Sequence, residues 1–520
     1  MAKRPGPISR RRALQGAGAL AALPSLVFAQ TAAAARPRLM QGVQSGDIGI
    51  DGATLWSRAD RPSRMIVEYA TKESFSTMRR IEGPLALEAT GFTSRLRLVD
   101  LPPGQTIFYR IAYADPATAG ATSDWVQGRF RTPPATAADV SFVWSADTVG
   151  QGWGINPDIG GMTIYEAMRL LAPDFFVHCG DTIYADDPLA SEKKLPDGRV
   201  WKNITTDAKS KVAESLAEFR GNHLYNFLDT NLRRFNAEVP MIALWDDHDV
   251  VDNWYREKHL EEDSRYREKN VSVLARRAER AFREFMPLAD GLDGPMRLYR
   301  KFSFGPRLDL IRLDMRSFRA ANGPNRQAVA GKDTAFLGLE QVGWLKQALK
   351  SSTATWKIIA ADMPLGLVVY DDWRRKSGSE AVANADDGPP LGRELEIAGL
   401  LSFIKRENIR NVHWLTADVH YPATHRYDPA RAAFQDFTPF YEFVSGPLCA
   451  GGFGPNALDG TFGPQVVFQK VPPPGRFDLS PLEGSCHFGH VKIDGRSGAM
   501  TVSHRDASGK VIHSLELMPS

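Results

Sequence analysis

The stretch Phe175-Phe176-Val177-His178-Cys179, followed directly by Gly180-Asp181-Thr182-Ile183-Tyr184, decides the fold of this chain. Its first half is an apolar run of strand length, which predicts a strand buried on both faces. Its second half places the carboxylate of Asp181 at the strand's end, where a buried charge is costly unless a cation pairs with it. Ligands bind outside the carboxyl ends of strands in open α/β sheets. The stretch therefore predicts a layered α/β domain with a charged site at one sheet edge.

Three further apolar runs end in the same kind of residue. They are 141–144 before Asp147, 241–245 before Asp246-Asp247-His248-Asp249, and 412–415 before Asp418 and His420. A strand-end aspartate taken alone is more often a turn former or a helix cap. Four such ends, all offering carboxylate or imidazole donors, predict that these side chains converge on a shared metal site.

The chain changes character after Pro134. Residues 38–132 carry short alternating runs, separated by turns rich in Pro, Gly and Asp. Such spacing predicts a small all-β sandwich of the fibronectin or immunoglobulin type. Pro133-Pro134 closes it, because consecutive prolines cannot continue a central strand. Over 139–520 strand patterns alternate with helical ones, including a long charged helix expected over 261–285, and this alternation predicts the α/β domain.

Residues 1–35 have the features of a twin-arginine signal peptide. Ser9-Arg10-Arg11-Arg12-Ala13-Leu14 carries the paired arginines, an apolar run extends over 13–28, and a small-residue cleavage site lies near 27–29. The alternative is the basic start of an ordinary helix. The signal predicts export by the twin-arginine translocase, and therefore a periplasmic or secreted protein.

The bulk composition excludes several classes of protein. The net charge is +3, but residues 1–29 contain five cations and no acid, which leaves 3 − 5 = −2 for the rest. A nearly neutral mature chain predicts no specific binding of nucleic acid. No later stretch approaches the roughly 20 apolar residues of a transmembrane helix, so we expect no transmembrane segment in the mature protein. Its three cysteines have no C-x-x-C spacing, which argues against a disulfide scaffold.

Taken in order, the motifs resemble the alkaline phosphatase D (PhoD-like) family of the calcineurin-like metallophosphatase superfamily. The segments that carry the resemblance are Gln44-Ser45-Gly46-Asp47, 51–58, 180–184, 245–249, 337–341 with Trp344-Leu345, 417–420 and 443–447. The resemblance implies a four-layered α/β/β/α domain preceded by the β-sandwich. It also implies hydrolysis of small-molecule phosphate monoesters or diesters, at a centre that contains one Fe³⁺ and one or more Ca²⁺.

The donor types bear on the choice of metal. Thr148 and Val149 follow Asp147 where common metallophosphatases have an imidazole, and Asp418 stands where the wider superfamily has a second one. Some relatives carry a cysteine at the first strand end, whereas this chain has Asp147. Oxygen ligands in place of nitrogen favour calcium and magnesium over zinc. A phenolate from Tyr184 would bind only beside a strongly charged cation, and Fe³⁺ is the natural partner.

Each site residue receives an expected role. The expected metal ligands are Asp147, Asp181, Tyr184, Asp247, Asn253, Asp418 and His420, and the expected catalytic residues are His248 and Asp181. Asp181 would bridge two metals. Asp147, Tyr184 and His420 would hold the iron, and Asp247 and Asp418 the divalent ion, with Asn253 as a neutral oxygen donor. His248 would face the leaving-group oxygen, as general acid or phosphate contact.

Several alternatives stay open at this level. Asp246 could replace Asp247 as the ligand, and Tyr184 could be a packed core residue with a bonded hydroxyl. Arg316 and Arg319 could contact a phosphate or form surface ion pairs. The alternative functions are a phospholipase-D-like phosphodiesterase that acts on lipid headgroups, and a calcium-binding surface recognition protein.

Overall fold

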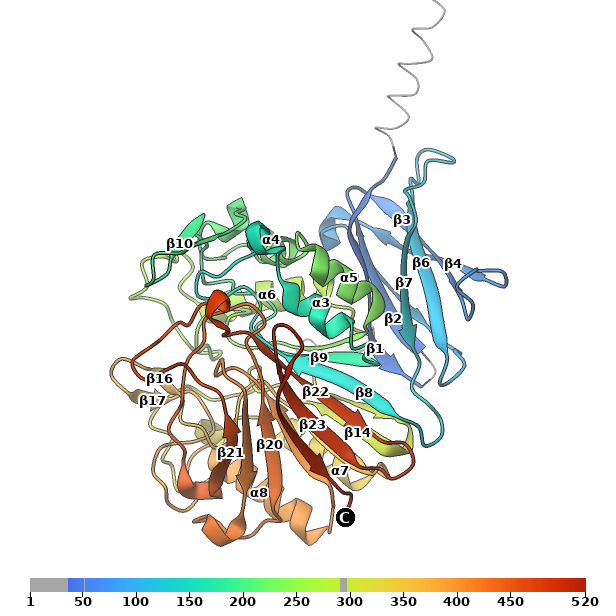
Figure 1. Ribbon diagram of the computed structural model, residues 1–520. Coiled ribbons are helices and arrows are strands. Elements are labelled where there is room, and N and C mark those ends of the chain that lie inside the picture. Colours follow the sequence, from blue (N-terminus) through green and yellow to red (C-terminus); the bar gives the residue numbers. More distant parts are fainter. Residues whose placement is uncertain (1–35, 51, 290–296) are drawn as a thin grey trace, which may run out of the picture.

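Two large β-sheets form the centre of the molecule (Figure 1). The computed structural model describes residues 36–50, 52–289 and 297–520, so the predicted signal peptide at 1–35 lies outside the described residues. The first sheet has nine strands, in the order β24 (Val511–Leu517), β23 (Met500–Asp506), β22 (His487–Ile493), β8 (Val140–Ser145), β9 (Phe175–Cys179), β12 (Met241–Leu244), β1 (Leu39–Gly49), β2 (Gly52–Ala59) and β5 (Thr93–Leu98). The second has seven, in the order β13 (Arg300–Phe304), β14 (Leu308–Arg312), β15 (Trp356–Ala360), β18 (Val412–Thr416), β20 (Phe440–Val444), β19 (Ala423–Tyr427) and β21 (Pro464–Gln469).

Alternate side chains of the central strands face different layers, as expected for strands buried on both faces. In β9, Phe175 and Val177 point into the core shared with the second sheet, whereas Phe176 points to helices on the outer face. The helices packed on the first sheet are α3 (Thr163–Arg169), α4 (Leu216–Asn226), α5 (Thr230–Glu238) and α6 (Val271–Phe285). Those on the second are α7 (Leu339–Lys350) and α8 (Glu394–Arg406). The predicted layer order α/β/β/α is confirmed (Figure 1).

The N-terminal part is all-β, as predicted. A four-stranded sheet packs against β1, β2 and β5, in the order β4 (Arg79–Ala86), β3 (Ser63–Ala70), β6 (Thr106–Ala114) and β7 (Val126–Arg131). Gly46 of β1 also pairs in parallel with Met241 of β12, so the nine-stranded sheet continues from the sandwich into the α/β part. The two parts therefore share one hydrophobic core, and the domain boundary predicted between 132 and 139 stays a prediction.

Two short hairpins lie on the left-hand side of Figure 1. They are β10 (Glu192–Lys194) with β11 (Val200–Lys202), and β16 (Tyr370–Asp372) with β17 (Ser377–Ser379). The second hairpin is tied to the loop after β12, because Asn253 Nδ2 donates to the Asp371 carbonyl over 3.1 Å. The hairpin thus stands beside the strand end that carries Asp247.

The helix expected over 261–285 is wrong for its first ten residues. α6 begins at Val271, after Asn270, whose side chain accepts a hydrogen bond from the Ser272 N–H. Residues 261–269 are charged, with Tyr266 as their one large apolar side chain, and turns hold them instead. Asp263 accepts from the Arg265 N–H at 3.0 Å, an aspartate turn that competes with helix.

The cysteines and the helices bear on two expectations from the composition. Cys179, Cys449 and Cys486 are buried free thiols, which fits small core side chains rather than a disulfide scaffold. Within the described ranges, none of the helices has both the length and the apolar character that crossing a membrane requires.

Candidate metal centre

The carboxyl ends of parallel strands from both sheets meet at one edge. β8, β9 and β12 are parallel in the first sheet, and β15, β18 and β20 are parallel in the second. The predicted ligands follow these strands directly, in the loops after β8, β9, β12 and β18. The site is therefore built where the two sheets come together, at the edge expected for ligand binding in an α/β sheet.

Asp147, Asp181 and His420 converge as predicted, with ligand atoms within 4.8 Å of one another. Asp147 is completely buried, and neither of its carboxylate oxygens has a hydrogen-bond partner in the described structure. Space for these oxygens depends on Gly446, where a Cβ would lie 2.4 Å from Asp147 Oδ2. A buried, unpaired carboxylate is unfavourable by several kcal/mol unless a cation compensates it. The donors present at this corner therefore fit a bound metal ion.

His420 is oriented as a metal ligand would be. Its Nδ1 lies 2.7 Å from the Gly451 carbonyl, to which it donates, so the lone pair of Nε2 faces the site. Nε2 is 2.9 Å from the Tyr184 hydroxyl and 3.7 Å from Asp147 Oδ1. Burial lowers the pKa of His420 to about 4, which keeps its imidazole neutral and able to coordinate.

Tyr184 points its hydroxyl into the same corner. Burial, together with the nearby Asp181 and Asp147, raises the pKa of this phenol well above its usual value. A phenolate at this position therefore depends on a neighbouring cation. The ring packs closely against the loop after β8, where a Cβ on Gly150 would lie 2.5 Å from Tyr184 Cζ.

A second group of donors shares Asp181 with the first. Asp181, Asp247 and His248 bring ligand atoms within 4.8 Å of one another, so Asp181 belongs to two of the three candidate groups. Its role as a bridging ligand stays a prediction. The His248 N–H donates to Asp181 Oδ1 at 3.1 Å, and the Asn253 N–H donates to Asp247 Oδ2 at 2.7 Å. Asn253 thus holds Asp247 through its backbone, while the predicted role of its side-chain oxygen as a ligand stays a prediction.

A third group consists of Asp246, Asp247 and Asp418, again with oxygens within 4.8 Å of one another. Asp247 belongs to both the second and the third group. Burial raises the pKa of Asp418 well above its usual range, with Glu380 and Asp247 adding to the effect. The pKa of Asp247 is lowered despite burial, because His248 and Arg316 favour its charged form.

His248 has two distinct ring nitrogens. Nδ1 lies 2.8 Å from Asp186 Oδ1, whereas Nε2 lies 3.9 Å from Asp247 Oδ2 and from Asp252 Oδ1. The ring stacks on Tyr184 with centroids 4.3 Å apart. Burial alone would lower the pKa of His248, but Asp186, Asp247 and Asp181 outweigh burial and raise it well above its usual value. These carboxylates therefore favour the charged form of the ring.

The backbone at the predicted ligands is strained. Left-handed φ angles occur at Asp147 (66°), Asp181 (50°), Asn253 (53°), Asp418 (67°) and His420 (61°). Such conformations cost energy in residues other than glycine and cluster at functional sites. Their occurrence at five of the predicted residues supports an arrangement that serves ligand binding.

Sequence reasoning missed Asp186 and did not foresee the burial of Arg316 and Arg319. Asp186 holds His248, but it lies in an Ala185-Asp186-Asp187 run with no distinctive spacing. Arg316 and Arg319 are completely buried in side chain, so the surface ion pairs considered for them are wrong. Arg316 follows β14, and its position at another strand end was the available signal.

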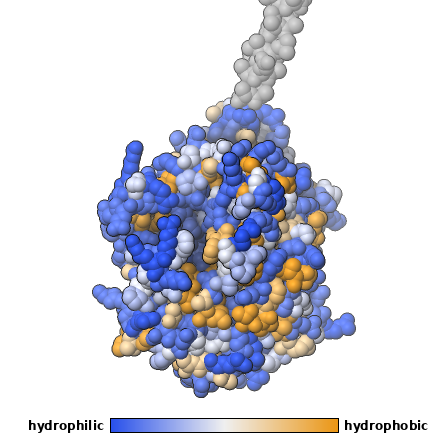
Figure 2. Space-filling view, turned by 60° about the vertical axis from the view of Figure 1, so that its left-hand side comes forward, coloured by the Kyte–Doolittle hydropathy of each residue, from blue (hydrophilic) through white to orange (hydrophobic). Residues whose placement is uncertain are grey.

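The centre reaches solvent near His248, whose side chain is 18% exposed. Asp252 lines an adjoining open cavity of about 440 Å³ together with Lys258, His259 and Arg265. Figure 2 brings the left-hand side of Figure 1 forward and shows a largely hydrophilic surface around a hollow near its middle.

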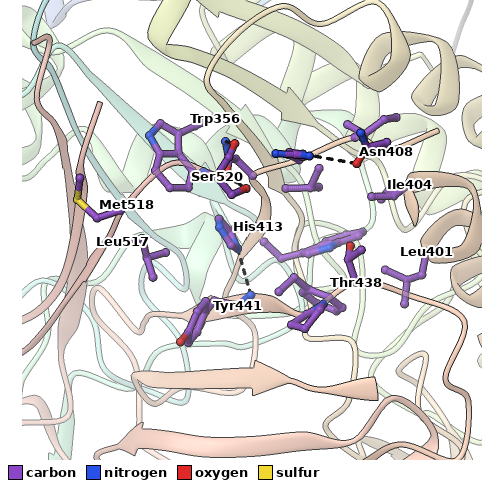
Figure 3. A pocket seen from close by; sticks show the side chains of 17 residues that line it. Trp356, Leu401, Ile404, Asn408, His413, Thr438, Tyr441, Leu517, Met518 and Ser520 are labelled. Carbon is purple, nitrogen blue, oxygen red and sulfur yellow. Dashed lines mark hydrogen bonds between the residues drawn. The ribbon is translucent and has the colours of Figure 1, made fainter. Parts of the chain in front are cut away.

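A separate cavity of about 410 Å³ is not part of this centre (Figure 3). It is lined by Trp356, His413 and Phe440, which stand at or next to the first residues of β15, β18 and β20. His413 Nδ1 accepts from the Tyr441 N–H at 3.1 Å. The cavity therefore lies at the opposite ends of the strands that carry the metal ligands.

Comparison with known proteins identifies the family. A model of the PhoD-like phosphatase matches residues 142–504, and a model of its N-terminal domain matches residues 25–134. The chain belongs to the PhoD-like phosphatase family. Alkaline phosphatase D of Bacillus subtilis (strain 168) is 28% identical over 484 residues, which cover 86% of this chain and 77% of that protein. This PhoD-like phosphatase is accordingly a phosphoric ester hydrolase. The family match favours this activity over the alternative function of a calcium-binding surface recognition protein.

Solved structures agree on the fold of this PhoD-like phosphatase. A structure of PhoD superposes with a TM-score of 0.66 at 21% identity and covers 92% of this chain and 89% of that one. A purple acid phosphatase from yellow lupin (Lupinus luteus) seeds superposes with a TM-score of 0.57 at 13% identity, covering 93% and 74%. Both likenesses support the metallophosphatase architecture that the two packed sheets display.

Proposed function

We propose that this PhoD-like phosphatase is an exported enzyme that hydrolyses phosphate monoesters, diesters or both at a centre of one ferric ion and at least one calcium ion. The observation that carries the proposal is Asp147. Its carboxylate is completely buried without a hydrogen-bond donor, next to Asp181 and His420. Burial raises the pKa of this carboxyl well above its usual range, and a bound cation would stabilise its charged form.

The proposed ligand assignment follows the grouping of donors. Asp147, Tyr184 and His420 would hold the ferric ion, Asp181 would bridge, and Asp247 and Asp418 would hold calcium, with Asn253 as a further oxygen donor. Asp147, Asp181, Tyr184, Asp247 and Asp418 would together contribute five negative charges. One Fe³⁺ and one Ca²⁺ balance these charges, and the oxygen-rich donor set suits hard ions.

The chain's own residues position the substrate and move a proton. Bound cations supply the central chemistry, because they offset charge on the phosphoryl oxygens and lower the pKa of an attacking water. His248 keeps Nδ1 engaged with Asp186 and directs Nε2 toward the centre. Its raised pKa supports a protonated ring that gives a proton to the leaving-group oxygen. None of these steps requires a nucleophilic side chain.

A matched pair of aspartate variants tests the proposal. We expect Asp147→Asn to lose metal, measured by elemental analysis, and to lose turnover of chromogenic phosphomonoesters and phosphodiesters. The control is Asp309→Asn, a buried aspartate at the opposite end of β14 whose Oδ2 accepts from Ser352 at 2.6 Å. Parental metal content and turnover in Asp147→Asn would contradict the proposed centre.

Export through the twin-arginine translocase is part of the proposal and is supported by Arg10-Arg11-Arg12 within residues 1–35. We expect replacement of these three arginines by lysine to leave the protein in the cytoplasmic fraction. Cell fractionation with activity assays measures this outcome, and unchanged export of the lysine variant would contradict a twin-arginine route.

A further inference from the structure

Arg316 is a buried cation that lies beside the third group of donors, Asp246, Asp247 and Asp418. Its side chain is completely shielded from solvent, beyond the carboxyl end of β14. Nε lies 2.5 Å from Asp246 Oδ1 and 3.3 Å from Asp362 Oδ2, and Nη1 binds Glu380. These three carboxylates hold the guanidinium on one side in a fixed orientation.

The other side of the guanidinium faces the centre. Nη2 has no hydrogen-bond partner in the described structure, yet it is 3.4 Å from Asp247 Oδ1 and 3.9 Å from Asp418 Oδ1. Asp246, Asp247 and Asp418 are also the three residues of the third potential metal group. Arg316 therefore lies next to every member of that group.

We propose that Arg316 is the resident cation of the Asp246–Asp247–Asp418 corner, where it excludes a further metal ion, takes Asp246 out of the ligand set and positions Asp247 and Asp418 to hold the calcium ion of the proposed centre. The inference rests on the proposed metal centre and goes beyond it, because it assigns a charge that the chain itself supplies. A guanidinium is always protonated and has five N–H donors in a rigid plane, which suits several carboxylates at once.

The contacts of Asp246 agree with this role. Its Oδ1 accepts from both Arg316 Nε and the Asp247 N–H, the latter at 2.9 Å. Asp247 instead turns Oδ2 toward Asn253 and His248. The ambiguity between the two adjacent aspartates is thereby resolved by Arg316, with Asp247 as the metal ligand and Asp246 as the arginine's partner.

The first experiment compares two adjacent residues in the full-length mature protein. Asp246→Asn and Asp247→Asn are loaded with iron and calcium, dialysed, and analysed for metal content per chain. We expect Asp246→Asn to keep the parental metal content and Asp247→Asn to lose about one ion. Loss of an ion from Asp246→Asn equal to the loss from Asp247→Asn would overturn the inference.

The second experiment removes the arginine's charge. Arg319 is the matched control, because it is equally buried and, among the described residues, forms its ion pair with Glu380 alone. We expect Arg316→Gln to bind about one additional calcium ion per chain, since the three carboxylates then lack their cation, and Arg319→Gln to keep the parental number. An unchanged calcium count in folded Arg316→Gln would overturn the inference.

The two readouts separate this inference from the proposed function. Turnover of phosphate esters by the parent protein tests the proposed function, whereas differences in metal count between variants test Arg316. If Arg316→Gln fails to fold, the comparison of Asp246→Asn with Asp247→Asn still decides the matter, because both variants retain the arginine.

Discussion

Tyr184 lies with its hydroxyl 2.9 Å from His420 Nε2 and its ring stacked on His248. If the phenolate binds Fe³⁺, the purified protein absorbs visible light through charge transfer from oxygen to iron. We expect Tyr184→Phe to lose this absorption band while it keeps the packing of the ring. An absorption spectrum of the iron-loaded protein measures the effect.

Tyr165→Phe is the control for this prediction. Tyr165 is also buried, and its hydroxyl contacts Thr148 Oγ1 at 3.1 Å in the neighbouring loop, outside the predicted ligand set. The control should keep the parental band. A Tyr184→Phe protein with an unchanged spectrum would show that the residue is only packed in the core.

His248 is predicted to act as an acid rather than as a metal ligand. His248→Gln should therefore reduce kcat by about 10²- to 10⁴-fold, the usual contribution of a positioned proton donor, without changing metal content. Steady-state kinetics together with metal analysis measures both quantities. Loss of a metal ion along with activity would identify His248 as a ligand instead.

Asp186→Asn tests the same residue through its pKa. The charge of Asp186 raises the pKa of His248, so its removal should lower that pKa. Because the active form carries the proton, the alkaline limb of the pH–rate profile should move to lower pH. A profile that stays in place would contradict the general-acid role.

The residues at the strand ends were predictable because their placement follows from local sequence. An apolar run fixes the strand, and the next few residues must then lie at the sheet edge, as for Asp147, Asp181 and His420. Arg316 was harder to predict, because its importance depends on carboxylates from four other segments. The proposed choice between Asp246 and Asp247 likewise depends on this distant arginine, whose Nε lies 2.5 Å from Asp246 Oδ1 and whose Nη2 lies 3.4 Å from Asp247 Oδ1.

At the scale of elements, the loop after β20 shapes the centre. Gly446 has a φ of 155°, and a Cβ there would lie 2.4 Å from Asp147 Oδ2. We expect Gly446→Ala to weaken metal binding, because either Asp147 or the loop must move. Metal titration followed by thermal unfolding should show a smaller metal-dependent rise in Tm than the parent protein.

Gly343→Ala provides the matched glycine substitution in a helix. Gly343 lies within α7, and a Cβ there meets nothing within 4 Å. The substitution should stabilise the protein by about 1 kcal/mol through helix propensity, with an unchanged metal response. If Gly446→Ala behaved like Gly343→Ala, the close approach to Asp147 would have no role in the centre.

Element boundaries were less predictable than element types. The sequence 261–285 has helix-forming residues throughout, but α6 needs an apolar stripe, and its buried side chains begin at Val271. Asn270 and Asp263 use their side chains to form a cap and a turn, respectively. These local hydrogen bonds replace helix over 261–270 and set the start of α6 at Val271, where its buried stripe begins.

At the scale of the whole molecule, the two sheets share a core that contains buried histidines. His504 of β23 is completely buried, and its Nε2 lies 3.0 Å from Thr424 Oγ1 of β19 in the other sheet. Burial, together with the nearby His513, His487 and His425, lowers the pKa of His504 to about 3. The contact between the sheets therefore depends on an uncharged imidazole.

This residue makes the fold sensitive to acid. The pKa of His504 is below its unfolded value of 6.5, so the unfolded chain binds the proton first as the pH falls. The stability that His504 contributes is complete above pH 6.5 and declines as the pH falls toward 3. Between pH 6 and pH 4 the free energy of unfolding should drop by about 2–3 kcal/mol on account of this one histidine.

His504→Gln isolates that contribution, because glutamine keeps a hydrogen-bonding side chain but does not titrate in this range. We expect the variant to be less stable at pH 7 and to lose less stability than the parent between pH 6 and pH 4. Urea unfolding at several pH values measures the difference, with the exposed His259→Gln as control. Parallel pH profiles for the parent and His504→Gln would show that the buried imidazole at the sheet interface does not set the acid sensitivity of the fold.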